Sequence, residues 1–123
     1  MPHKILIVDD DKISTTLIKF ALADKRYDVT CAADGAQGLE CVQEIKPDLI
    51  ILDVHMPNMD GFEFIKELKR KGGYNVPPVI ILTVNETMRD VFVHEGVIGY
   101  FMKPCNTRTL LSTIVGYLGE NTE

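Results

Sequence analysis

Short apolar runs alternate along the chain with longer segments in which apolar residues recur every three or four positions. A half-exposed strand would alternate apolar and polar residues, so continuous runs such as Leu49–Leu52 are typical of strands covered on both faces. The run at 27–32 has the weakest pattern. Together these runs predict five strands, over residues 5–8, 27–32, 49–52, 79–82 and 100–102.

The segments between these runs predict helices. Ile13, Leu17, Phe20 and Ala21 recur at helical spacing and predict a first helix over residues 12–25. The pattern at 87–95 is less regular, because its apolar residues do not form one clean stripe. The later helices are expected between Asp34 and Pro47, from Asp60 to Gly72-Gly73, over about 87–95, and from Asn106 to Leu118.

Polar residues mark several of these helix starts. Asp34 with Gln37, and Asp60 with Glu63, have the spacing of a capping box. Asp11 is the third of three successive carboxylates, and we assign it to capping the first helix. Contact with the outer shell of a metal ion is the alternative for Asp11.

Five strands that alternate with helices indicate right-handed crossovers and a parallel sheet covered on both faces. We therefore expect a doubly wound α/β fold. A chain of 123 residues suits one domain, and the sequence contains no internal repeat or charged linker. We expect a single domain over residues 1–123, with a core over 4–118 and a loose tail over 119–123.

Polar side chains directly follow four of the five predicted strands. Asp9 and Asp10 follow the first strand, Asp53 the third, Thr83 the fourth and Lys103 the fifth. The carboxyl ends of parallel strands share the edge where such sheets bind ligands, so we expect these side chains to meet there. Asp53 taken alone could equally well start the following turn. Carboxylates, a hydroxyl and an ammonium at four strand ends together favour a functional site.

The charges of these groups indicate which chemistry they suit. Carboxylates held together raise one another's pKa unless a cation lies between them. Mg²⁺ fits, because it takes one or two carboxylates and leaves positions for phosphate oxygens. Asp53 could then attack phosphorus as a nucleophile and form an acyl phosphate. The Lys103 ammonium and the Thr83 hydroxyl would stabilise the negative charge that results.

The composition argues against several function classes. The 18 acidic and 13 basic residues give a net charge of -5, which disfavours nucleic-acid binding by this domain. The three cysteines and three histidines have no metal-like spacing, so we expect reduced, packed thiols. No apolar run approaches the ~20 residues of a membrane span, and the N-terminus lacks the pattern of a signal peptide. We expect a soluble, cytoplasmic protein that does not bind membranes.

The motifs in this chain resemble those of the receiver domain of two-component response regulators. The acidic pair of ILIVDD, the block LDVHMPNMDG, the strand-end threonine of IILT and the segment YFMKP occur in the family's order and at its spacing. The block matches the pattern D-x-x-M-P-x-x-D-G. The resemblance covers residues 4–118 and implies a flavodoxin-like fold with strand order 2-1-3-4-5.

The resemblance also implies the roles of the strand-end residues. Asp53 matches the phosphoacceptor, which receives its phosphoryl group from a phosphohistidine on a sensor histidine kinase or a histidine phosphotransfer protein. Asp9, Asp10 and Asp53 match the carboxylates that hold Mg²⁺, and the main-chain carbonyl of His55 matches the remaining protein ligand. Thr83 matches one of the two residues that bind the phosphoryl oxygens.

Further positions match the binding and switching parts of the family. Lys103 matches the second phosphoryl-binding residue, and the Lys103-Pro104 bond matches one that is usually cis. Tyr100 matches the aromatic residue that rotates inward after the threonine hydroxyl moves. This rotation remodels the face formed by the fourth helix, fifth strand and fifth helix. His55 and Asn85 occupy positions that tune dephosphorylation in the family, and the pattern does not fix their roles.

The leading hypothesis is a single-domain phosphorylation switch or phosphorelay protein that signals to a downstream protein. It would catalyse its own phosphoryl transfer and slow autodephosphorylation, without conventional substrate turnover. The sequence does not decide between a monomer and a homodimer. A rival hypothesis is a phosphohydrolase of haloacid dehalogenase type, although His55 replaces the second aspartate of its D-x-D motif. Turnover of phosphate esters would favour that class. A receiver-like adaptor that is not phosphorylated is a third hypothesis, and a flavin-binding module is a weaker one.

Overall fold

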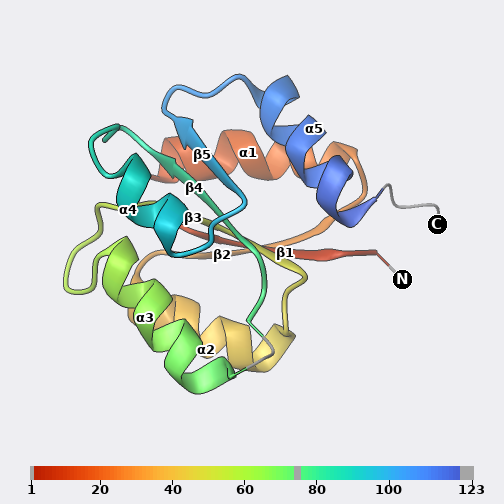
Figure 1. Cartoon of the computed structure of the whole chain (residues 1–123). Helices are drawn as coiled ribbons and strands as arrows, with labels where there is room; N and C mark the ends of the chain where they lie inside the picture. The colour runs from red at the N-terminus through yellow and green to blue at the C-terminus, as the bar shows by residue number, and fades with distance from the viewer. Residues whose placement is uncertain (1, 74–75, 120–123) are drawn as a thin grey trace.

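Figure 1 shows the computed structural model of the chain, which describes residues 2–73 and 76–119. Within these residues five strands alternate with five helices. In chain order the elements are β1 (Lys4–Val8), α1 (Lys12–Asp24), β2 (Asp28–Ala32), α2 (Gly35–Ile45), β3 (Leu49–Leu52), α3 (Gly61–Gly72), β4 (Val79–Thr83), α4 (Arg89–His94), β5 (Gly99–Met102) and α5 (Thr107–Leu118).

The strands form one parallel sheet in the order β2-β1-β3-β4-β5. Helices cover both faces, with α1 and α5 on one side and α2 and α3 on the other (Figure 1). The predicted doubly wound fold and its strand order are therefore confirmed. Every residue of β3 and β4 is buried, as the continuous apolar runs indicated.

The core consists of two hydrophobic layers, one on each face of the sheet. Successive strand residues point to opposite faces, so Leu6 and Val8 join one layer while Ile5 and Ile7 join the other. Phe64 and Phe92 bring α3 and α4 into the first layer. The buried helix residues of the second layer are Ile18, Leu22, Leu110 and Ile114.

The caps predicted at Asp11, Asp34 and Asp60 are confirmed, and Asn106 caps α5 in the same way. The side chains of Asp11, Asp34, Asp60 and Asn106 each accept hydrogen bonds from main-chain amides in the first turn of the helix that follows. These bonds satisfy donors that a helix start otherwise leaves without a partner.

Most of the apolar residues whose spacing predicted α1 lie on its exposed face and not on the face that packs against the sheet. Ile13, Leu17 and Phe20, whose spacing predicted the helix, are 76%, 61% and 72% exposed. Ile18 and Leu22 instead face the sheet and are buried. The helix has apolar residues on two faces, and only one of them packs into the hydrophobic layer between the sheet, α1 and α5.

Several element boundaries differ from the prediction by one or two residues, and hydrogen bonds account for two of these differences. The helix expected at 87–95 spans only Arg89–His94, because the main-chain amide and hydroxyl of Thr87 both donate to the Asn85 side chain. This turn holds the chain outside the helix. The strand expected from residue 27 begins at Asp28, because the Tyr27 amide donates to Leu22 and closes the end of α1.

Three remaining expectations concern the thiols, the membrane and the tail. The three cysteines are free and partly buried. Over residues 2–73 and 76–119, no helix has the length and apolar character to cross a membrane. Of the predicted loose tail, only Gly119 belongs to the described part of the chain, and its amide donates to Val115 at the end of α5.

Candidate functional site

Main-chain pairing brings the strand-end side chains to one edge of the sheet. Val8 of β1 lies beside Leu52 of β3, and the Asp53 amide donates to the Val8 carbonyl at 3.0 Å. Asp9 and Asp53 therefore leave neighbouring strands at the same level. On the other side, the Lys103 amide donates to the Thr83 carbonyl at 2.8 Å. The bond between Lys103 and Pro104 is cis, as the resemblance implied.

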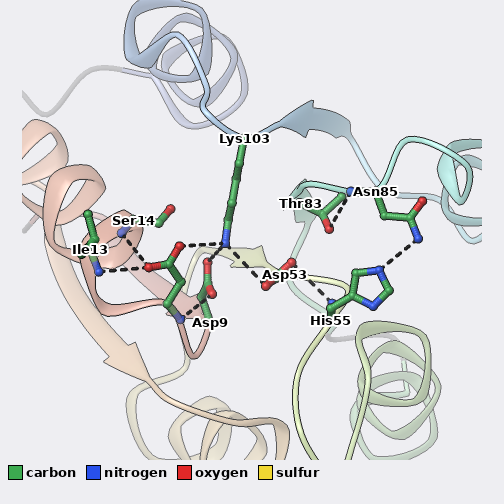
Figure 2. Close-up of polar contacts among 9 residues, drawn as sticks. Asp9, Ile13, Ser14, Asp53, His55, Thr83, Asn85 and Lys103 are labelled. Carbon is green, nitrogen blue, oxygen red and sulfur yellow. Dashed lines mark hydrogen bonds and ion pairs between the residues drawn. The ribbon is translucent and has the colours of Figure 1, made fainter.

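Lys103 reaches across the edge to the carboxylates (Figure 2). Its Nζ atom lies 2.8 Å from Asp9 Oδ2, 3.5 Å from Asp53 Oδ2 and 3.8 Å from Asp11 Oδ2. The side chains of Lys103, Asp9 and Asp53 are only 12%, 4% and 8% exposed. Water therefore screens these charges much less than it would on an open surface.

Burial and neighbouring charges shift the pKa values in this cluster. Burial raises the pKa of Asp9, against the opposing effects of the Lys103 ammonium and the Asp11 amide. Burial by itself would lower the pKa of Lys103, but the hydrogen bond to Asp9 and the Asp53 and Asp11 charges outweigh it. The pKa of Lys103 is therefore raised, and its ammonium stays protonated at neutral pH.

The carboxylates fit a hard divalent cation. One oxygen from each of Asp9, Asp10 and Asp53 lies within 4.8 Å of the others. Carboxylate oxygens are the ligands that Mg²⁺ takes, and the exposed Asp10 leaves the cluster open to solvent on one side. A cation would also offset the repulsion that a single Lys103 leaves between these groups. The fourth expected ligand, the main-chain carbonyl of His55, stays a prediction.

The loop after β3 is shaped by a close approach of α3 to Asp53. The Gly61 amide donates to the Val54 carbonyl at 2.8 Å. A Cβ atom on Gly61 would lie 2.9 Å from both the Asp53 carbonyl oxygen and Val54 Cα. These are main-chain atoms that cannot rotate away, so only glycine fits. Asp53 Oδ1 faces the His55 amide at 3.4 Å (Figure 2).

Thr83 and Tyr100 are linked through the loop after β4. Thr83 is fully buried, and its Oγ1 faces the Asn85 amide at 3.4 Å. Tyr100 is 7% exposed, and its hydroxyl donates to the Asn85 carbonyl. Burial raises the pKa of the Tyr100 phenol. The two residues expected to switch thus share Asn85 as a neighbour.

The structure brings together the strand-end residues that the sequence singled out, and Asn85 lies beside both Thr83 and His55. The Asn85 side chain binds Thr87 and also lies 3.0 Å from the His55 ring. An asparagine side chain often accepts a hydrogen bond from the amide two residues later, which forms an Asx turn. The bond between Asn85 and Thr87 is of this kind, so the sequence carries a local signal for it. The contact with His55 has no local signal, since the two residues are 30 positions apart.

Comparisons with known proteins agree with this geometry. The sequence matches the family described as response regulator receiver domain over residues 5–115. The chemotaxis protein CheY4 of Vibrio cholerae is 35% identical, with a TM-score of 0.85 over 96% of this chain and 100% of that chain. A CheY-like receiver domain protein of Methanospirillum hungatei is 30% identical, with a TM-score of 0.83 over 94% and 93% of the two chains.

A putative response regulator of Chloroflexus aurantiacus is similar to the chain at 27% identity, with a TM-score of 0.85 over 94% of this chain and 97% of that chain. The strand-end residues, the sheet order and these matches over nearly the whole length agree with one another. The chain belongs to the receiver domain family of two-component response regulators.

Proposed function

We propose that Asp53 accepts a phosphoryl group from a phosphohistidine on a sensor histidine kinase or a histidine phosphotransfer protein. The observation that carries this proposal is the meeting of three carboxylates and the Lys103 ammonium at one edge of the sheet. Asp53 is the candidate nucleophile because it follows β3 at the centre of this edge, between the β1 and β4 ends. We propose the cytoplasm as the place where it meets its donor.

In the transfer, an Asp53 carboxylate oxygen bonds to phosphorus while the bond from phosphorus to the donor imidazole breaks. The electron pair of that bond goes to the imidazole nitrogen. Lys103 stays protonated, and its Nζ atom, 3.5 Å from Asp53 Oδ2, offsets the negative charge brought to this position. Mg²⁺ held by Asp9, Asp10 and Asp53 would supply further positive charge toward the phosphoryl oxygens.

The response is proposed to pass from Thr83 through Asn85 to Tyr100. We propose that the Thr83 hydroxyl binds a phosphoryl oxygen, and the loop that follows Thr83 carries the acceptor for the Tyr100 hydroxyl. Tyr100 belongs to β5 and packs against Phe92 of α4, so the surface formed by α4, β5 and α5 would report the change to a downstream protein. Shifting two states from 1:99 to 99:1 takes about 5.5 kcal/mol of differential stabilisation.

The phosphodonor is proposed to dock on α1 and the loop after β5. A groove of about 320 Å³ runs between these segments, and Lys103 lines both the groove and the phosphoacceptor site. Ile13, Leu17 and Val84 also line it and are mostly exposed. A protein that brings its phosphohistidine to Asp53 must cover this rim, and burying these side chains would favour its binding.

The phosphoacceptor is tested by incubation with a small phosphodonor and Mg²⁺, followed by intact-protein mass spectrometry. The wild-type chain should gain one phosphate, and Asp53→Asn should gain none. Asp24→Asn serves as a matched control, because Asp24 is an exposed carboxylate at the end of α1. It should be labelled like the wild type.

Three other results would contradict this proposal. Equal labelling of wild type and Asp53→Asn would move the acceptor to another residue. Absence of labelling in every chain would favour the adaptor without phosphorylation. Multiple turnover of small phosphate esters by the purified protein would favour the phosphohydrolase.

A further inference from the structure

A side-chain bridge joins the loop that follows Asp53 to the loop that follows Thr83. The Nε2 atom of His55 lies 3.0 Å from the Nδ2 atom of Asn85 (Figure 2). The Asn85 Oδ1 atom accepts from the Thr87 amide at 2.9 Å and from the Thr87 hydroxyl at 2.6 Å. These donors fix the orientation of the amide, so Nδ2 faces His55 and donates to its ring.

The main chain of Asn85 connects this bridge to both residues of the switch. Its amide faces Thr83 Oγ1 at 3.4 Å, and its carbonyl accepts the Tyr100 hydroxyl. Asn85 therefore has two kinds of neighbour: His55 and Thr87 through its side chain, and Thr83 and Tyr100 through its main chain. A change in the main-chain position of Asn85 would therefore move both the side chain that faces His55 and the carbonyl that Tyr100 uses.

Tyr100 is in turn packed against α4. Its ring centroid lies 6.2 Å from that of Phe92, and the Arg89 guanidinium lies 4.9 Å above its ring. Arg89 Nη1 also donates to the Tyr100 carbonyl at 3.3 Å. Arg89 is the first residue of α4, so the position of Tyr100 is linked directly to the start of this helix.

We propose that His55 is a positioning residue, which holds Asn85 through this side-chain bridge so that the Asn85 carbonyl retains Tyr100 in its inward position. The loop after Asp53 is then connected through His55, Asn85 and Tyr100 to the surface formed by α4, β5 and α5. This connection does not involve the Thr83 hydroxyl. This inference rests on the proposed function only in treating Tyr100 as the switch residue.

The bridge is tested by NMR of the tyrosine rings in the chain without any phosphodonor. Tyr100→Phe identifies the Tyr100 signal among the four tyrosines. His55→Phe keeps an aromatic ring but removes the acceptor, and it should lower the ratio of inward to outward Tyr100 about fivefold, the effect of one net hydrogen bond. His55→Gln, whose side-chain oxygen can accept in a similar place, should restore the wild-type signal.

Asn85→Ala completes a double-mutant cycle. If the bridge acts as one unit, the double variant His55→Phe/Asn85→Ala should shift Tyr100 no further than Asn85→Ala alone. Asp90→Asn changes an exposed side chain in the first turn of α4 and should leave the Tyr100 signal in place.

An unchanged Tyr100 signal in His55→Phe would overturn the proposal, and so would fully additive shifts in the cycle. Failure of His55→Gln to restore the signal would likewise reject the acceptor role of the ring. None of these measurements requires a phosphoryl group. Loss of the bridge and loss of the phosphoacceptor function can therefore be told apart by comparing them with Asp53 labelling.

Discussion

At the scale of single residues, the carboxylates of the site outnumber the Lys103 ammonium that pairs with them. Lys103 pairs with Asp9 at 2.8 Å and lies farther from Asp53 and Asp11. Asp10 is exposed and belongs to the cluster of carboxylate oxygens. The excess of carboxylates favours a bound divalent cation, because the cation reduces their mutual repulsion.

We therefore predict that Mg²⁺ stabilises the folded chain without any phosphodonor. At ten times its Kd, a ligand that binds only the folded state adds about 1.4 kcal/mol to the free energy of unfolding. Asp10→Asn should lose most of this gain, because it removes one carboxylate from the cluster. Asp10 is exposed to solvent, so the substitution itself should cost the folded chain little stability. Thermal unfolding with and without Mg²⁺ measures the difference.

The control for this prediction is Asp24→Asn, which should gain as much stability from Mg²⁺ as the wild type. An equal gain in Asp10→Asn would place the cation elsewhere. Ca²⁺ provides a second comparison, since it also prefers oxygen ligands but accepts a larger and less regular coordination shell.

Most residues of the site were predictable because their places at the ends of strands can be identified from the order of the sequence. Asp53, Thr83 and Lys103 directly follow or end buried strand runs, and a parallel sheet brings such positions to one edge. The close approach of Gly61 to the main chain at Asp53 and the contact of His55 with Asn85 were not predictable from strand ends. They depend on how two loops approach each other in space, which no local pattern describes.

At the scale of elements, α1 shows what periodicity can and cannot predict. The spacing of Ile13, Leu17 and Phe20 indicated a helix correctly, but these side chains lie on its exposed face. Ile18 and Leu22 are also four residues apart and form the buried face. Two apolar faces give the same helical signal, and only packing against the sheet distinguishes them.

This assignment predicts different costs for the same substitution at two leucines of α1. Leu22→Ala should lower the free energy of unfolding by about 2–5 kcal/mol, because Leu22 is fully buried and its loss leaves a cavity. Leu17→Ala should change it by less than about 0.5 kcal/mol, since Leu17 is 61% exposed. Denaturant unfolding of the two variants checks this. Similar costs would contradict the assigned orientation of α1.

At the scale of the whole molecule, the two faces of the sheet are suited to different tasks. The Tyr100 connection lies in the layer with α4, whereas the groove beside Lys103 lies in the layer with α1 and α5. A donor protein bound on α1 would therefore leave the α4 part of the proposed signalling surface accessible, while α5 borders both surfaces. Both surfaces share the phosphoacceptor edge, which lies between them.

This separation predicts that apolar residues of α1 affect transfer from a protein donor but not from a small one. Leu17→Ala should lower kcat/KM about tenfold with a phosphorylated histidine phosphotransfer protein that labels the wild type, because the variant offers less apolar surface for the donor to bury. Labelling by a small phosphodonor should change less than about twofold, since that reaction needs no contact with α1. Val93→Ala removes a similarly exposed apolar side chain from α4 and should alter neither rate. A loss of both rates in Leu17→Ala would show damage to the site itself, and no loss with the protein donor would place the docking surface away from α1.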